Sequence, residues 1–164
     1  MGIFIGIDPG ASGGIAALRE DRSIVTAARM PETDKDILDL LRALAAESRA
    51  VENGFALIER VHAGVFAQNR KMGVVSAFSF GGIYRALKMA LTAAEIPYDE
   101  VTPLKWQTAL GCRSRGDKNI TKAKAQELFP ILPSGLRITH ATADSLLLAE
   151  YNWRVNRLTK GAEE

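Results

Sequence analysis

Three carboxylates in this sequence stand where a charged side chain is costly unless a cation or hydrogen bonds meet it. Asp8 and Glu59 each close a short apolar run, and Asp144 is the one charged residue in the apolar segment 143–149. Aspartate is a poor residue for a helix interior, so Asp144 in particular asks for an explanation. Asp8 has an ordinary alternative as a cap on the Pro9–Gly10 turn, and Glu59 as a solvated strand end.

His140 adds an imidazole to these carboxylates. It precedes Asp144 by four residues, so in a helix both side chains project from one face, about one turn apart. The alternative is an ordinary histidine at a helix start. The candidate metal ligands are therefore Asp8, Glu59, His140 and Asp144.

Three carboxylates and one imidazole suit divalent metal ions. Two ions about 3.5–4 Å apart can activate a water and stabilise the leaving oxygen of a phosphodiester. Oxygen ligands favour Mg²⁺ or Mn²⁺, and the imidazole favours Mn²⁺ modestly. The absence of cysteine ligands and of a helically spaced histidine pair disfavours zinc.

The elements that must position these residues alternate between strands and helices. Short apolar, β-branched runs bounded by turn residues predict strands, and apolar residues three or four apart predict helices. The expected strands span residues 2–8, 15–18, 24–28, 55–59 and 98–101, the first three as an antiparallel meander. The expected helices run from 31–34 to a stop at Asn53–Gly54, then over 74–94, 103–110, 117 or 119 to 129, and 139–158. This order indicates a mixed α/β fold.

Length and composition indicate one globular domain, residues 1–164. The chain is 47% hydrophobic and 24% charged, and at this length it can bury about two-thirds of its unfolded surface without a disulfide. The single cysteine, Cys112, excludes an internal disulfide framework, and no run of about 18 apolar residues is present. We therefore expect an unprocessed cytosolic protein, with no membrane span and a frayed tail from about residue 160.

The positive charge is concentrated in the middle of the chain. The formal net charge is +2, but residues 60–126 carry 11 Lys and Arg against 4 Asp and Glu, whereas residues 1–59 carry 6 against 10. A polyanionic partner is one explanation of this basic segment. The alternative is a solvated basic surface that balances acidic helices elsewhere.

Six short motifs lie in order over nearly the whole chain. They are Ile5–Gly10 with Ser12–Gly14, Leu57–Ala63, Ser76–Gly81, Val101–Pro103 with Trp106, Gly116–Lys118, and Ala143–Tyr151. Together they resemble the RuvC Holliday junction resolvases of the ribonuclease H-like superfamily, most closely the phage and prophage branch.

The resemblance implies a ribonuclease H-like mixed five-stranded sheet, three antiparallel strands and then parallel strands, flanked by helices. It also implies a homodimeric, metal-dependent endodeoxyribonuclease of the bacterial cytosol, encoded by a bacterium or by a phage. Such an enzyme resolves four-way DNA junctions by paired phosphodiester hydrolysis, with Mg²⁺ or Mn²⁺.

Individual roles follow from the same resemblance. Asp8, Glu59 and Asp144 match metal ligands, and Lys118 matches a lysine near the scissile phosphate. His140 stands where many relatives have a second aspartate, which leaves the choice between Mg²⁺ and Mn²⁺ open. Phage relatives often have lysine directly after the tryptophan, whereas this chain has Gln107 there, with Lys105 just before the tryptophan.

DNA contacts are expected from two groups of residues. Rings can stack on unpaired bases and basic side chains can hold phosphates. The first group is His62, Phe66, Arg70 and Lys71, and the second is Arg113, Arg115, Lys118, Lys122 and Lys124. An alternative for Phe66 is packing beneath its own loop.

The helix expected at 74–94 is apolar nearly all round, so it should bury more than one face. A four-way junction is two-fold symmetric, and paired cutting needs two active sites related by a matching axis. This helix is therefore the candidate dimer surface. The alternative is that it is the central core helix of one domain.

Other functions remain open at this point. A sibling activity is a broader endonuclease acting on flaps, forks and other branched DNA. Gly6–Gly10 with Ser12–Gly14 also resembles the first phosphate loop of sugar kinases and actin-like ATPases, but those proteins need two such domains. A non-catalytic DNA-binding module is a third class, against which the three carboxylates argue.

Overall fold

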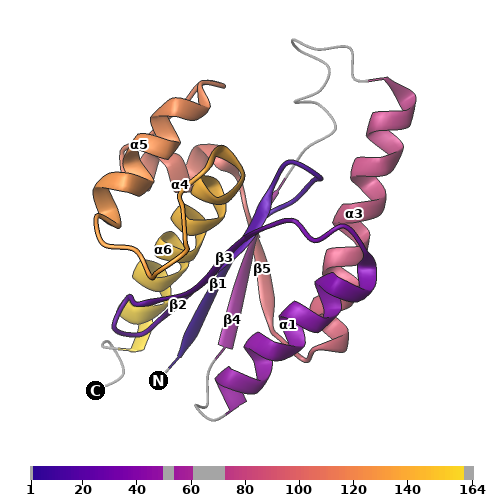
Figure 1. Cartoon of the computed structure of the whole chain (residues 1–164), viewed down its shortest axis with the longest axis horizontal. Helices are drawn as coiled ribbons and strands as arrows, with labels where there is room; N and C mark the ends of the chain where they lie inside the picture. Colours follow the sequence, from indigo (N-terminus) through magenta and orange to yellow (C-terminus); the bar gives the residue numbers. More distant parts are fainter. Residues whose placement is uncertain (1, 50–53, 61–72, 161–164) are drawn as a thin grey trace.

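The computed structural model describes residues 2–49, 54–60 and 73–160. A five-stranded sheet lies between two layers of helices (Figure 1). The strands are β1 (Ile3–Asp8), β2 (Gly14–Arg19), β3 (Ile24–Arg29), β4 (Gly54–Glu59) and β5 (Tyr98–Val101). The helices are α1 (Asp34–Arg49), α3 (Val74–Ala93), α4 (Pro103–Leu110), α5 (Lys118–Leu128) and α6 (His140–Lys160).

The sheet has the order β3-β2-β1-β4-β5. β1, β2 and β3 form the expected antiparallel meander, and β4 and β5 continue the sheet in parallel with β1. The expected mixed sheet of antiparallel and parallel strands, flanked by helices, is thus confirmed. No helix among the described residues combines the length and apolar character that crossing a membrane requires.

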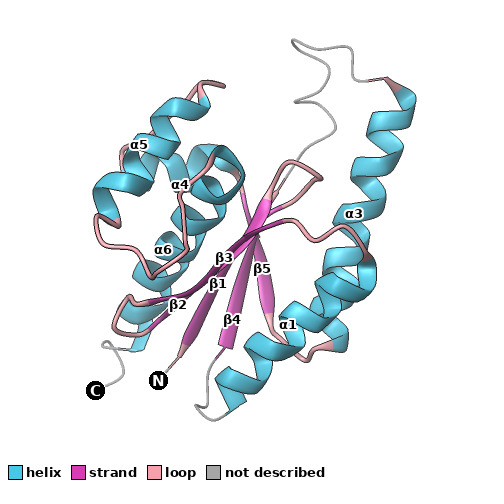
Figure 2. Ribbon diagram, viewed as in Figure 1, coloured by secondary structure: helices cyan, strands magenta, loops and turns pink. Residues whose placement is uncertain are grey.

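Each face of the sheet has its own hydrophobic core because successive strand residues point to opposite faces. Ile3, Ile5 and Ile7 of β1 pack with α1 and α3 on one face. Leu57 of β4 belongs to the other core, with α4, α5 and α6. Figure 2 shows α1 and α3 on one side of the strands and α4, α5 and α6 on the other. Asp8 is in register with the second face, since it alternates with Ile7.

Helix α6 lies very close to β1. A Cβ atom at Gly6 would collide with the backbone of Ser145 and Ala149, so only glycine permits this approach. Further along the helix, Nδ2 of Asn152 donates to the carbonyl oxygens of Ile5, at 2.9 Å, and Phe55, at 2.8 Å. The helix is therefore held against both β1 and β4.

Local signals set most element ends. Thr33 accepts a hydrogen bond from the amide of Asp36 at 3.1 Å before α1, and Asp117 accepts from the amide of Asn119 at 2.9 Å before α5. Gly111 ends α4 with φ 67°, as its position predicted. Helix α1 is described as far as Arg49 and Gly54 begins β4; the expected stop of this helix at Asn53 lies outside the described residues.

Helix α3 differs between its two halves. Leu87 and Leu91 in the C-terminal half are fully buried, so this half is a core helix, as the alternative interpretation expected. Val75 and Phe78 in the N-terminal half are 80% and 84% exposed. This half extends beyond the sheet in Figure 1. Within this chain the N-terminal half therefore leaves apolar side chains uncovered, and the expectation that the helix is a dimer surface stays a prediction.

Candidate active site

Asp8 and Glu59 end neighbouring parallel strands. Ile7 of β1 is paired with Ile58 of β4, so the next residues, Asp8 and Glu59, stand side by side at the same edge of the sheet. Both follow residues that face the other core, so both point to the face covered by α6. The two carboxylates that the sequence analysis selected at strand ends are therefore neighbours in the fold.

The start of α6 brings Asp144 to the same edge. A Cβ atom at Gly14, which is paired with Asp8, would collide with the carbonyl of Ala141. Ser145 lies against Gly6, two residues before Asp8. Because α6 runs back across β1 from this edge, its first turns, with Asp144, lie beside the ends of β1 and β4.

Burial dominates the electrostatics of these carboxylates. It raises the pKa of Asp8 well above its usual range, and the nearby charges of Glu59 and Asp144 raise that pKa further. Burial also raises the pKa of Glu59 to about 7. The positive charge of Lys118 lowers the pKa of both Asp8 and Glu59. The acidic groups therefore repel one another and favour a cation between them.

Asp144 carries an unsatisfied atom. Its Oδ1 is buried and has no hydrogen-bond partner among the described residues. Burial raises the pKa of Asp144, and the Thr121 hydroxyl, Lys118 and His140 counteract this rise. A buried oxygen without a donor is costly in a folded protein, so the fold keeps this acceptor available for something outside the chain.

Glu59 and His140 are each held by a neighbour. The indole Nε1–H of Trp106 donates to Oε2 of Glu59 at 2.7 Å. Nε2 of the exposed His140 lies 3.1 Å from Oδ1 of Asn119. An amide oxygen only accepts, so when the neutral imidazole donates from Nε2 in this contact, Nδ1 keeps its lone pair.

The donor set fits a hard divalent cation. The fit rests on the orphaned Oδ1 of Asp144 and on three mutually repelling carboxylates. Among residues 2–49, 54–60 and 73–160, no group of three His, Cys, Asp or Glu side chains is close enough to form a complete cluster around one ion. Mg²⁺ usually takes one or two carboxylates together with waters and substrate phosphates, so an open site of this kind suits it.

The second predicted basic group lies on α5 and the loop before it. Arg113, Arg115 and Lys118 are exposed, and Arg115 adopts φ 48°, in the left-handed region. Nζ of Lys124 is 2.8 Å from Oε1 of Glu127, and the expectation that Lys124 contacts DNA stays a prediction. The first basic group, His62, Phe66, Arg70 and Lys71, lies outside the described residues.

Three residues of this site had no individual role in the sequence analysis. Trp106 appeared only within a motif, Asn119 only as one of two alternative starts of a helix, and Gly6 only within a strand and its motifs. A glycine within an otherwise β-branched strand is the one signal in the sequence that indicates a close backbone approach. The contacts of Trp106 and Asn119 join residues 47 and 21 positions apart, which no local pattern reveals.

Comparison with known proteins identifies the fold. No protein family model matches the chain, and no curated protein has a significantly similar sequence. A solved structure of Thermus thermophilus RuvC in complex with Holliday junction substrate has a TM-score of 0.61 and 19% identity, covering 96% of both chains. Another Thermus thermophilus RuvC structure gives 0.62 and 17%, again covering 96% of both.

A third solved structure is similar over most of the chain. The yeast mitochondrial Holliday junction resolvase Ydc2 has a TM-score of 0.50 and 16% identity, over 96% of this chain and 80% of its own. The chain therefore has a RuvC-like, ribonuclease H-like fold, as the six sequence motifs implied.

Proposed function

We propose that this protein is a metal-dependent endonuclease that resolves four-way DNA junctions as a homodimer. The observation that carries the proposal is the group of three carboxylates at one sheet edge, Asp8, Glu59 and Asp144, which no arginine among the described residues neutralises and whose Asp144 Oδ1 has no partner. Unsatisfied buried charge at one edge of a fold is typical of a functional site. The shared fold with the RuvC and Ydc2 resolvases supports the choice of substrate.

Asp8, Glu59, Asp144 and His140 would hold one or two Mg²⁺ or Mn²⁺ ions. Such ions supply activation of water and stabilisation of the leaving oxygen of a phosphodiester. The backbone holds the three carboxylates at one edge of the sheet, because β1, β4 and α6 are fixed by core packing. His140 offers Nδ1 at the rim of the site while Asn119 holds its other nitrogen.

The basic side chains of the loop before α5 and of α5 itself provide phosphate contacts. Lys118 lies close enough to the carboxylates to lower their pKa values, so it would contact the phosphate that is cut. Arg113, Arg115 and Lys122 would hold neighbouring phosphates without reading sequence. Binding should therefore weaken with salt.

The exposed half of α3 supports a second copy as the partner. Val75 and Phe78 project from it into solvent. Gly81 and Gly82 lie inside the same helix with open space around their Cβ positions, although glycine costs about 1 kcal/mol relative to alanine there. A second α3 approaching this surface would cover the apolar side chains and use the space at the glycines.

A cleavage assay tests this proposal. The substrates are a mobile four-way junction, a flap and a plain duplex of shared sequence, each with Mg²⁺, Mn²⁺ or EDTA. We expect metal-dependent paired cuts in the junction and little cutting of the duplex. Asp8→Asn should abolish cleavage but keep junction binding, whereas Asp99→Asn, the same change at an exposed residue of β5, should cut normally.

The outcomes separate the alternatives. Equal cleavage of flap and junction indicates a broader branched-DNA endonuclease, and binding without cleavage under every metal indicates a non-catalytic module. Phe78→Glu tests the dimer, because a buried charge at the interface should shift the protein to monomers in sedimentation. Paired cutting by a Phe78→Glu monomer contradicts the assignment of this interface.

A further inference from the structure

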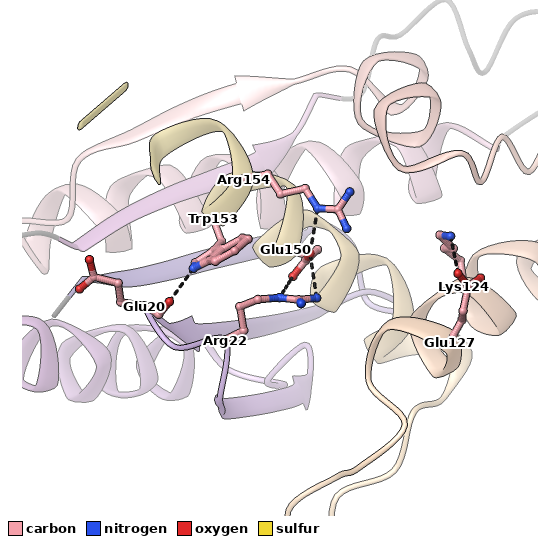
Figure 3. Close-up of polar contacts among 7 residues, drawn as sticks. All are labelled: Glu20, Arg22, Lys124, Glu127, Glu150, Trp153 and Arg154. Atoms are coloured by element: carbon pink, nitrogen blue, oxygen red, sulfur yellow. Dashed lines mark hydrogen bonds and ion pairs between the residues drawn. The ribbon is translucent and has the colours of Figure 1, made fainter. Parts of the chain in front are cut away.

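Trp106 contacts the proposed metal site directly. Its indole is fully buried between α4, the sheet and α6, and its Nε1–H donates to Oε2 of Glu59 at 2.7 Å. A buried indole N–H needs an acceptor, but a backbone carbonyl is sufficient. The partly exposed Trp153 uses such an acceptor, since its indole donates to the carbonyl of Glu20 at 2.8 Å (Figure 3).

Helix α4, which carries Trp106, is fixed by capping interactions at both ends. Thr102 caps α4 by accepting a hydrogen bond from the amide of Lys105, and Pro103 occupies the first turn. Gly111 ends the helix in the left-handed conformation. With the indole fully buried between these ends, the position of Nε1 is set by the fold rather than by a mobile side chain.

Because of this hydrogen bond, the two carboxylate oxygens of Glu59 differ in their availability to a ligand. Oε2 is occupied by the indole, and no hydrogen bond from the described residues reaches Oε1. A carboxylate held through one oxygen presents the other in one orientation, and partners of this kind orient metal ligands in proteins. A free Glu59 side chain at the strand end would have to be ordered when the cation binds.

We propose that Trp106 is a positioning residue for the metal site, holding Oε2 of Glu59 so that Oε1 alone faces a divalent cation. This inference rests on the proposed function, because it needs a cation at Glu59. It goes further in giving a role to a residue on α4, an element that supplies none of the proposed ligands.

The two tryptophans of the chain provide an internal control in NMR. Protein labelled with ¹⁵N shows one indole N–H signal for each, assigned with Trp106→Phe and Trp153→Phe. Titration of the DNA-free protein with Mg²⁺ should shift the Trp106 signal and leave the Trp153 signal in place. This measurement uses the unmutated protein, so it stands even if Trp106→Phe folds poorly.

Metal affinity gives the second readout. Trp106→Phe should weaken Mg²⁺ binding by about tenfold or more, measured by calorimetry or by the rise in melting temperature with Mg²⁺. Trp153→Phe should bind Mg²⁺ as the unmutated protein does. A Trp106 signal that stays in place while Mg²⁺ binds, or equal affinity in Trp106→Phe, overturns the positioning role alone. If neither Mg²⁺ nor Mn²⁺ binds the unmutated protein, the proposed function fails and this inference with it.

Discussion

Helix α6 carries two acidic residues in opposite situations. Glu150 has a fully buried side chain and accepts hydrogen bonds from Nε and one terminal nitrogen of Arg22, both at 3.0 Å, and from Nε of Arg154 at 2.8 Å. Figure 3 shows both arginines converging on it. Asp144, six residues earlier, has a buried Oδ1 without a partner among the described residues.

The difference between Glu150 and Asp144 indicates a structural role for the first and a functional role for the second. The fold can supply donors to a buried carboxylate on this helix, since it gives Glu150 a bidentate arginine whose guanidinium also lies 5.2 Å from the ring of Trp153. It supplies none to Oδ1 of Asp144 and places Asp8 and Glu59 nearby instead. Glu150, whose oxygens have hydrogen-bond donors, joins α6 to the β2–β3 turn through Arg22. Asp144, whose Oδ1 has no donor among the described residues, can accept a ligand.

The largest expected effect is on activity at Asp144. Asp144→Asn removes a charge that the cation needs, so junction cleavage should fall at least about 100-fold, equivalent to about 2.7 kcal/mol of transition-state stabilisation. The free energy of unfolding should stay the same or rise, because a repulsive charge is lost. Gel assays and denaturant titration measure the two effects. Loss of stability together with activity would place Asp144 in the same structural class as Glu150.

Glu150→Gln should show the reverse pattern. Removing the charge leaves two arginines without their buried counter-ion, so the free energy of unfolding should fall by about 3 kcal/mol. Cleavage at low temperature should remain. Glu127→Gln is the matched control, because Glu127 forms an exposed pair with Lys124 (Figure 3), and its loss should cost less than about 1 kcal/mol. Equal effects of the two substitutions contradict the structural role of Glu150.

A smaller change is expected in the free energy of unfolding of the metal-free protein as the pH is varied. Burial raises the pKa of Glu59 from 4.5 to about 7 in the folded protein, so between these values the native state binds more protons than the unfolded state. Stability should therefore decrease as the pH rises from about 4.5 to about 7. Denaturant midpoints in EDTA at several pH values measure the slope, and Glu59→Gln should flatten it.

Added Mg²⁺ or Mn²⁺ should restore the stability lost at the upper end of that pH range, because a cation favours the ionised carboxylates of the native state. Denaturant midpoints at pH 8, with metal and with EDTA, measure this effect. A metal-free protein that is more stable at pH 8 than at pH 5 contradicts the proposed repulsion among Asp8, Glu59 and Asp144.

The sequence was informative about the elements because their signals are local. Apolar runs placed β1 and β4 and put Asp8 and Glu59 at their ends, and Gly111 and Asp117 marked helix ends through turn and cap chemistry. The apolar character of α3 was also visible. Which half of it belongs to the core was not, because that depends on how far the sheet extends beneath the helix.

Residue types, their order and the six motifs were enough to indicate the mixed α/β fold and three candidate carboxylates, since strand periodicity and strand-end charge are properties of neighbouring residues. The tertiary structure alone decided that α6 returns across Gly6 to bring Asp144 beside Asp8, that Glu150 meets Arg22, and that Trp106 meets Glu59. Arg22 and Glu150 are 128 positions apart, and Gly6 is further still from Ser145 and Ala149, so only the packing of α4 and α6 on the sheet brings these residues together.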